Sequence, residues 1–414
     1  MNAYLLLIYF IALLLLFVRY VHKKKCFDAG ALLILVFLVC SLATVISYGP
    51  KYTETSFFIP LIYLFLALYL SFKPILRIQP TTEIVFPKRS VIAVFSWLFI
   101  VCSFLGMATS STNVWEGLVQ VVTNDSYGLE TYQNMLGNVE ASGHAIHNLP
   151  MLIMNIMYSF AALLFFIHLT YKKPNKLLLV LLGFTLFYGA IKYVSIGERG
   201  GLINRALIVL VSYFSIKEYI PKKLNKTIRK IGIVIGVIII VPFLALTNSR
   251  FGDTEEGSTN NIYNYAGQGT INFCRYALDD NGIRYGDRTV SLFKRILGFP
   301  NVPHNFLERR DKYPQLRIND EVFSTFVGDL AIDFGPIVAF LLILLVSFLL
   351  SNMVKRYSNR IFFHHFILLH LLMCIIVQGA SLFQYSDSGN LTILFYFLVY
   401  VFFKYSNVYV FSNK

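Results

Sequence analysis

Long apolar runs recur along most of this chain, and they restrict its fold more than any other feature. Eleven runs of about 17 to 25 residues are present, the seventh and the last being short. They are 3–21, 27–47, 56–72, 90–108, 149–171, 177–196, 201–216, 231–247, 333–351, 361–383 and 389–403. With 56% apolar and only 14% charged residues, the sequence predicts an all-α polytopic integral membrane protein rather than several soluble domains.

The sign of the linkers between these runs predicts an orientation. Basic linkers follow every second run, at 22–25, 73–89, 172–176, 217–230, 355–360 and from 404 onward. Because short basic linkers are retained on the cytoplasmic side, we expect a cytoplasmic C-terminus and an outside N-terminus. The first run is longer than a typical signal core, and no basic residue precedes it, so we expect it to stay as a signal anchor.

One large polar segment, 247–332, separates eight predicted spans in 1–246 from three in 333–414. It carries eight arginines and two lysines, and linker signs place it outside. A guanidinium pairs with two oxygens of a phosphate or carboxylate, so arginines that topology does not require indicate an anionic ligand. The alternative is that they pair with the loop's own acids. Apolar periodicity predicts amphipathic helices at 262–278, 289–297 and 321–332.

Two arginines stand at a short outer turn. Arg199 lies between glycines where the seventh predicted helix begins, and Arg205 is expected about one turn inside the apolar zone. A helix N-terminus carries partial positive charge, so cations there are unfavourable unless an anion joins them. A charge at the depth of Arg205 is costly and usually functional. The alternative is a snorkelling Arg205 that pairs with Glu198.

Two carboxylates and one histidine are candidate acid–base groups. Asp329 and Asp333 are spaced to share one helix face. We expect Asp333 to cap the following helix, which leaves Asp329 as the better candidate general base. Histidine is a residue type that can accept a hydroxyl proton, so His304 could act instead, while Arg309 and Arg310 could hold a phosphate.

The sequence offers no clear metal or cofactor motif. His144 and His147 lack a third ligand of suitable spacing, and the five cysteines are spread singly. The outer loops contain no Asp-x-Asp pair, and the chain has no Walker or dinucleotide fingerprint. We therefore expect neither metal nor cofactor, with arginine meeting the charge of any leaving group.

These features together resemble the Wzy-type polysaccharide polymerases. The resemblance lies in the span count, the dominant outer loop before the last three spans, and two patches, Ile196-Gly197-Glu198-Arg199-Gly200 and 323–335 with its Gly-Asp and Asp-Phe-Gly. It implies a GT-C-like, metal-independent glycosyltransferase of the bacterial cytoplasmic (inner) membrane. Such an enzyme transfers a growing glycan from undecaprenyl diphosphate to another lipid-linked repeat unit, making O antigen or capsule.

The resemblance also implies roles for residues and partners. Arg199 matches an outer-loop arginine thought to hold the diphosphate, and Arg205, Arg250 and Arg275 could add positive charge. Asp329 or His304 could supply the base. Donor and acceptor would both be undecaprenyl-diphosphate-linked glycans, with a chain-length regulator and a flippase as further partners and no nucleic acid.

Two alternatives remain open. His304-Asn305-x-Leu307 is similar to a motif of the O-antigen ligases, but there a glycine-rich span begins much sooner, whereas here about thirty residues intervene. A lipid-linked oligosaccharide flippase or transporter belongs to a different class. Transporters usually show repeat symmetry and polar groups at mid-membrane, and this sequence shows neither clearly.

Overall fold

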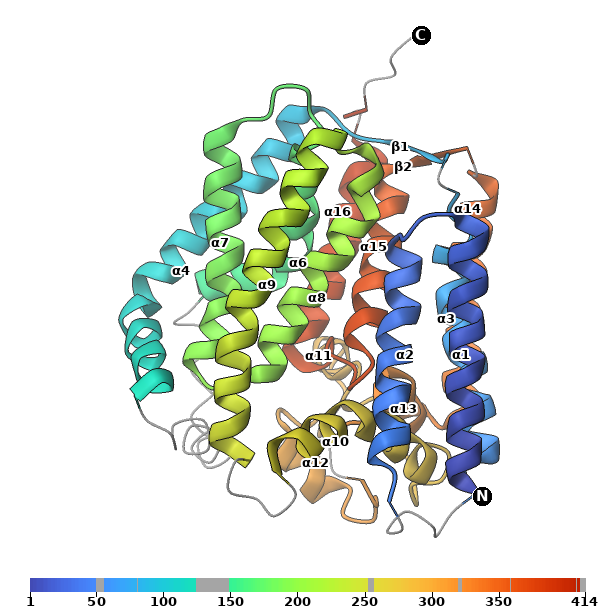
Figure 1. The fold of residues 1–414 in the computed structure, drawn as a ribbon. Helices are drawn as coiled ribbons and strands as arrows, with labels where there is room; N and C mark the ends of the chain where they lie inside the picture. Colours follow the sequence, from blue (N-terminus) through green and yellow to red (C-terminus); the bar gives the residue numbers. More distant parts are fainter. Residues whose placement is uncertain are drawn as a thin grey trace. The chain divides into compact units, whose positions relative to one another are not determined.

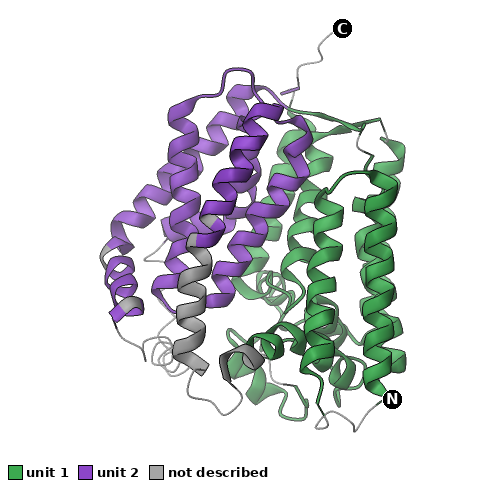
Figure 2. Ribbon diagram, viewed as in Figure 1, with its two compact units in different colours: residues 1–86, 262–407 green, residues 87–261, 408–414 purple. Residues whose placement is uncertain are grey.

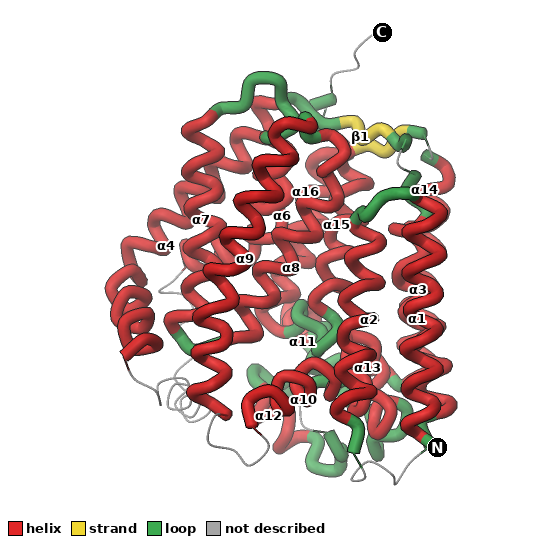
Figure 3. The backbone as a smooth tube through the Cα atoms, viewed as in Figure 1, coloured by secondary structure: helices red, strands yellow, loops and turns green. Residues whose placement is uncertain are grey.

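The computed structural model describes residues 1–49, 56–79, 81–123, 149–251, 257–318, 322–357, 359–406 and 408–409, with backbone only at 112, 122, 235, 238–251 and 257–261. Figures 1 and 3 show that helices dominate this part of the chain. Among the described residues, nine helices are long and apolar enough to cross a membrane. The chain is therefore an all-α membrane protein, as its apolar runs predicted.

Nine of the eleven predicted runs coincide with these nine helices of the described chain. They are α1 (Asn2–Lys24), α2 (Ala29–Ser47), α3 (Phe58–Leu76), α4 (Arg89–Thr123), α6 (Leu149–His168), α7 (Lys176–Ser195), α8 (Arg199–Ile216), α14 (Pro336–Arg356) and α16 (Asn390–Tyr405). The predicted run 231–247 lies within α9 (Lys222–Phe251), which extends past the expected start of the polar loop.

The predicted span 361–383 is shorter than expected. Its helix, α15 (Phe363–Gln378), has 16 residues and ends before the apolar run does. The backbone beyond it is used elsewhere: Thr325 N–H donates to the Ser381 carbonyl at 2.8 Å, and Phe326 N–H donates to the Gly379 carbonyl at 2.8 Å. Because these carbonyls pair with another segment, the apolar composition of 379–383 does not produce helix.

The chain packs as two compact units (Figure 2). Unit 1 comprises residues 1–86 and 262–407, and unit 2 comprises residues 87–261 and 408–414. The predicted division into 1–246, 247–332 and 333–414 follows topology, and the units cut across it. In unit 1 the first three helices pack with elements from the end of the chain, as α14 does against α3 and α15 against α2.

The two ends of unit 1 differ in character. At one end β1 (Glu83–Val85) pairs in parallel with β2 (Arg360–Phe362), and Lys24 Nζ bonds to the Ile78 carbonyl, so basic linkers gather there. At the other end, where α1 begins, lie the elements of the polar loop (Figure 1). They are α10 (Gly257–Asn272), the π-helical turn η4 (Phe273–Ala277), α11 (Ser291–Ile296), α12 (Phe306–Lys312) and α13 (Thr325–Phe334).

The loop helices start and stop for local reasons. Asn305 Oδ1 accepts the Glu308 N–H at 2.9 Å, and Glu308 Oε2 accepts the His304 N–H at 2.7 Å, which satisfies two N–H groups at the start of α12. Gly335, at φ 79°, separates α13 from α14, and Pro336 occupies the first turn of α14. The helices predicted at 262–278, 289–297 and 321–332 correspond to α10 with η4, α11 and α13.

Two glycines let α10 approach its neighbours in unit 1 closely. A Cβ on Gly267 would lie 2.7 Å from Thr44 N of α2, and one on Gly269 would lie 2.6 Å from the Ala380 carbonyl oxygen. Because Gly267 has no Cβ, the two segments lie close enough for Thr44 Oγ1 to donate to the Gly267 carbonyl at 3.0 Å. The polar loop is therefore anchored on the helices of unit 1 by direct backbone packing.

In unit 2, α4 packs along α6 and α7, and α6, α7 and α8 all pack on one another. Two backbone hydrogen bonds close the short turn between α7 and α8. Gly197 N–H donates to the Val194 carbonyl at 3.0 Å, and Glu198 N–H donates to the Tyr193 carbonyl at 2.8 Å. This turn fixes the start of α8, on which Arg199 and Arg205 lie.

Candidate functional site

Four buried charged side chains form the loop cluster of unit 1: Arg284, Arg288, Asp329 and Asp333. The two carboxylates lie one turn apart on α13, sharing one face as predicted, and both are 0% exposed. Arg288 Nη1 donates to Asp329 Oδ1 at 2.8 Å. Arg284 bridges the pair, with Nε 2.7 Å from Asp333 Oδ1 and Nη2 3.7 Å from Asp329 Oδ1.

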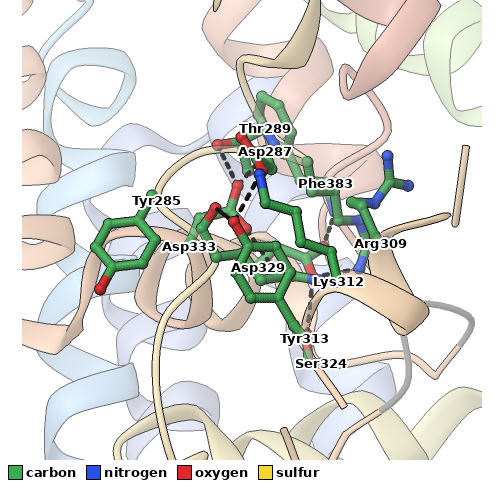
Figure 4. A network of polar contacts seen from close by, with 12 residues as sticks. Tyr285, Asp287, Thr289, Arg309, Lys312, Tyr313, Ser324, Asp329, Asp333 and Phe383 are labelled. Atoms are coloured by element: carbon green, nitrogen blue, oxygen red, sulfur yellow. Dashed lines mark hydrogen bonds and ion pairs between the residues drawn. The ribbon is translucent and has the colours of Figure 1, made fainter. Parts of the chain in front are cut away.

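The remaining donors to this cluster are neutral groups (Figure 4). Asp329 also accepts the Ser324 hydroxyl at 3.1 Å and the Phe383 N–H at 2.6 Å. Its two oxygens are thus occupied by an arginine, a hydroxyl and a backbone amide. To act as a general base Asp329 would have to break these bonds inside a buried site, so the geometry favours a structural role in joining α13 to residue 383.

Asp333 does not cap α14, and that prediction is wrong. The residue before α14 is Gly335, and no side chain caps this helix. Asp333 Oδ2 instead accepts the Thr289 N–H and the Thr289 hydroxyl, both at 2.7 Å. The carboxylate therefore fixes the segment before α11 rather than the helix that follows it.

Asp287 is the centre of a second group of charges, also drawn in Figure 4. It accepts from Lys294 Nζ, from Lys312 Nζ at 2.6 Å and from the Tyr313 hydroxyl at 2.7 Å. Burial by itself raises the pKa of Asp287, but the bonds from Lys294, Lys312 and Tyr313 outweigh it and lower the pKa. Burial, and then the bond to Asp287, raise the pKa of Tyr313.

Arg309, predicted to hold a phosphate, pairs with an acid of this chain. Its Nη1 and Nη2 donate to the two oxygens of Asp387 at 2.9 and 3.0 Å, and the Ser291 hydroxyl joins the same carboxylate at 2.8 Å. Arg309 is buried, and Asp387 belongs to the short connection η5 (Asp387–Gly389) before α16. For this arginine the structure supports the alternative that was left open, pairing with an internal acid.

A pocket of about 490 Å³ opens beside this braced region of unit 1, and we call it the loop pocket. Its wall is formed by residues of α11, of α12 and of the turn between them: Arg295, Phe299, Asn301, Val302, Pro303, His304, Glu308 and Lys312. His304 is exposed there. Arg295 Nη1 donates to the Pro303 carbonyl at 2.8 Å, and no carboxylate of the described chain pairs with it. An exposed imidazole and a guanidinium that no carboxylate of the described chain pairs with thus line the same pocket.

In unit 2, Arg205 contacts several neutral groups, and it also interacts electrostatically with Glu198, the partner that the alternative named. Its Nη2 donates to Asn155 Oδ1 at 2.9 Å and to the Tyr193 hydroxyl at 3.1 Å. The guanidinium carbon stands 4.0 Å from the centre of the Tyr158 ring and 5.4 Å from that of Tyr193. We call Asn155, Tyr158, Tyr193 and Arg205 the Arg205 cage. Its side chains come from α6, α7 and α8, and Arg205 is 9% exposed.

Two glycines make room for the rings of this cage. A Cβ on Gly189 would lie 2.8 Å from the Tyr158 ring, and one on Gly201 would lie 2.0 Å from the Tyr193 ring. Gly201 lies two positions after Arg199 at the start of α8. For Gly201 the close neighbour is Tyr193 of the same unit, so this glycine positions a ring that holds Arg205.

The other predicted site residues are dispersed. Arg199 is buried at the start of α8, whereas Arg310 is exposed on α12. Arg275 lies half-buried in η4, with its guanidinium carbon 4.8 Å from the centre of the Tyr276 ring. Arg250 belongs to α9, and its side chain lies outside the described residues.

Several side chains of these sites were not anticipated. Tyr158 and Tyr193 sit in runs that count only as apolar, although Asn155 and Tyr158, one turn apart, do place two polar groups on one face of a predicted span. Arg295 and Lys312 were counted among the loop cations without being distinguished. Nothing in their spacing indicates that they share a pocket with His304.

Within the described residues, no group of three His, Cys, Asp or Glu side chains could hold a metal ion, and His144 and His147 lie outside those residues. The chain matches no protein-family model, and comparisons with curated proteins and with solved structures found no match.

Proposed function

We propose that this membrane protein is a glycosyltransferase that polymerises undecaprenyl-diphosphate-linked oligosaccharide repeat units into O antigen or capsular polysaccharide. The activity follows from the resemblance of the sequence to the Wzy-type polymerases. One structural observation supports it above the others, which is the Arg205 cage. The proposal places the reaction at the outer face of the bacterial cytoplasmic membrane, with a GT-C-like fold and a cytoplasmic C-terminus.

The Arg205 cage supports an anion-holding role because of what surrounds the guanidinium. An arginine inside an apolar helix costs several kcal/mol (about 2.5 to 3.5 at the centre of a span). Aromatic faces and neutral oxygens offset part of this cost and orient the side chain. Arg205 also interacts electrostatically with Glu198 at the start of α8, while the groups that hydrogen-bond to it here are neutral. Arg199 lies less than two turns away on the same helix, so two guanidinium groups lie near this helix start.

The reaction needs a base and a stabilised leaving group. The acceptor hydroxyl attacks the anomeric carbon of the donor sugar, its proton passes to the base, and the bond from that carbon to the diphosphate oxygen breaks with inversion. Within unit 1 the candidate base is His304, because it is exposed on a pocket, whereas Asp329 is enclosed by its donors. Within unit 2 the candidate groups for the charge of a diphosphate are the guanidinium groups of Arg199 and Arg205.

The loop cluster has a supporting role in this proposal. A site held within a fraction of an ångström needs rigid surroundings, and buried Arg–Asp pairs fix α13, the segment before α11 and residue 383 to one another. Arg309 and Asp387 do the same for α12 and η5. The polar loop is then a preorganised support rather than a row of free cations.

The test is incubation of the purified protein with a synthetic undecaprenyl-diphosphate-linked repeat unit, with and without a chelator. A glycan ladder that forms in both conditions supports a metal-independent polymerase. Arg199→Ala and Arg205→Met should each abolish the ladder, and His304→Gln should slow it with a changed pH profile. No ladder from the wild-type protein, together with uptake of substrate into vesicles, overturns the proposal in favour of a transporter.

A further inference from the structure

The wall of the loop pocket combines one phenyl ring, one imidazole, several polar groups and cations, so it offers a ligand more contacts than a single proton acceptor would. Its volume of about 490 Å³ lies within the range of small-ligand sites, roughly 300 to 1,000 Å³. Phe299 is 55% exposed on this wall and keeps its ring accessible to an apolar surface. Sugar rings present C–H groups on one face and hydroxyls at the edge, which suits such a mixed wall.

The charges around the pocket can be counted from their contacts. Lys294 and Lys312 both bond to Asp287, so that one carboxylate serves two ammonium groups. Arg295 bonds to a carbonyl, and Glu308 is held by His304 N–H and by the Asn305 side chain. The three cations are thus Lys294, Lys312 and Arg295, and the two carboxylates are Asp287 and Glu308. The five side chains together carry one net positive charge.

One net positive charge matches a monoanion better than a diphosphate. A pyrophosphate group would bring at least two negative charges next to Glu308, and like charges in a partly desolvated pocket repel. A sugar carboxylate brings one, and Arg295 presents the planar fork that bonds to both of its oxygens. Glu308 and Asn301 remain as partners for sugar hydroxyls.

We infer that the loop pocket is a saccharide subsite that selects an acidic sugar, with Arg295 receiving the sugar carboxylate and Phe299 lying against the ring. This inference rests on the proposed function for its biological meaning, since it makes the repeat unit an acidic one. The binding itself is a property of the pocket and is measured without any transfer reaction.

The experiment is calorimetric titration of the detergent-solubilised full chain with three probes: a glucuronic acid-containing disaccharide, the neutral disaccharide of the same linkage, and inorganic pyrophosphate. We expect the acidic disaccharide to bind about tenfold to a hundredfold more tightly than the neutral one, the factor of a charge-assisted bond. Equal binding of the two disaccharides, or tighter binding of pyrophosphate that depends on Arg295, overturns the inference.

Variants separate the parts of the pocket. Arg295→Met should reduce the affinity for the acidic disaccharide to that of the neutral one, whereas Phe299→Leu should weaken both alike. Arg317→Met is the matched control, because Arg317 is an exposed arginine of the same loop that bonds to Asn281 outside the pocket. It should leave all three affinities unchanged.

Glu308→Gln keeps the contacts that start α12, because a glutamine can replace glutamate in that arrangement. It removes the negative charge that disfavours pyrophosphate, so it should raise pyrophosphate affinity several-fold while Arg295→Met lowers it. If Arg295→Met fails to fold, Glu308→Gln still tests the charge argument. An unchanged pyrophosphate affinity in Glu308→Gln overturns it.

Failure of this inference and failure of the proposed function give different results. A protein that polymerises neutral and acidic lipid-linked units equally well, with no disaccharide preference, retains the function and loses the subsite. A protein that binds the acidic disaccharide through Arg295 but forms no ladder retains the subsite and loses the function.

Discussion

The buried arginines of the two units bond to different kinds of partner. In unit 1, Arg284, Arg288 and Arg309 each face a carboxylate at 2.7 to 2.9 Å. In unit 2, Arg205 is held by an amide oxygen, a phenol and aromatic faces. Arginines of the first kind bind parts of the loop together. Arg205 is oriented by neutral groups and also interacts electrostatically with Glu198, so its hydrogen bonds differ in kind from the ion pairs of unit 1.

This comparison corrects the idea that the loop arginines act alike. Their abundance on one side suggested a shared ligand, yet several are used as fixed links between α11, α12, α13 and η5. Arg295 differs from them, because a carbonyl rather than a carboxylate bonds to it. These arginines are therefore distinguished by the charge of the group that bonds to each of them. Four substitutions are compared by the change that each makes in the free energy of unfolding.

The largest effect is expected for Asp329→Asn. The change leaves Arg288 buried without its acid, and breaking a buried ion pair by removing one partner costs about 3 to 5 kcal/mol. Thermal and denaturant unfolding in detergent measures it. Asp279→Asn is the control, since Asp279 is exposed and lies 3.8 Å from Arg317, a pair worth at most about 1 kcal/mol. Full stability with lost transfer in Asp329→Asn would instead make Asp329 the base.

The second effect is a pH dependence of stability that arises from Asp280, a buried carboxylate of unit 1. Asp280 Oδ1 accepts the N–H groups of Arg317 and Ile318 at 3.0 and 3.1 Å, whereas Oδ2 is buried with no hydrogen-bond partner in the described chain. Burial raises the pKa of Asp280 to about 6. Because the folded pKa exceeds the unfolded one, this group favours the folded state below about pH 4 and loses that contribution as pH rises through about 6.

Asp280→Asn keeps an acceptor and removes the titration. We expect the variant to be more stable than the wild type at pH 7, by at most about 3 kcal/mol, with the gap closing below about pH 4. Unfolding measured across this pH range provides the check. A wild-type chain whose stability rises between pH 4 and 6 relative to the variant would show that Asp280 is an ion-pair partner like Asp329.

A third, smaller effect is expected for Gly201→Ala. The added methyl group would meet the Tyr193 ring, and inserting a methyl into a packed site costs about 1 to 3 kcal/mol. Displacement of Tyr193 also removes a bond to Arg205, so anion binding should fall along with the unfolding midpoint. Gly232→Ala on α9, where nothing lies within 4 Å of the new Cβ, should instead leave the midpoint unchanged or raise it.

The smallest change in stability is expected for Arg205→Met, although transfer should be lost. The variant loses the cation–π contacts and two hydrogen bonds, but it also removes the cost of a buried charge, so we expect a net change within about 1 kcal/mol. Unfolding midpoints compared with those of Asp329→Asn make the contrast direct. A loss as large as that of Asp329→Asn would assign Arg205 to the scaffold.

The sequence by itself determined the membrane class and most helix positions, because an apolar run long enough to cross a bilayer has few other ways to fold. It also placed the break at Gly335 and Pro336, since their backbone preferences are local. It put Asp329 and Asp333 on one face, because helical spacing is fixed. These are properties of residues close together in the chain.

Only the tertiary structure decided which partner each charge has. Arg288 meets Asp329 across 41 positions, and Arg309 meets Asp387 across 78. No local pattern specifies such distances, because they depend on how loop and helices pack within unit 1. The same holds for the end of α15, where an apolar run leaves the helix because its carbonyls pair with the start of α13. The sequence thus supplied the charges, and packing divided them into links and candidate binding groups.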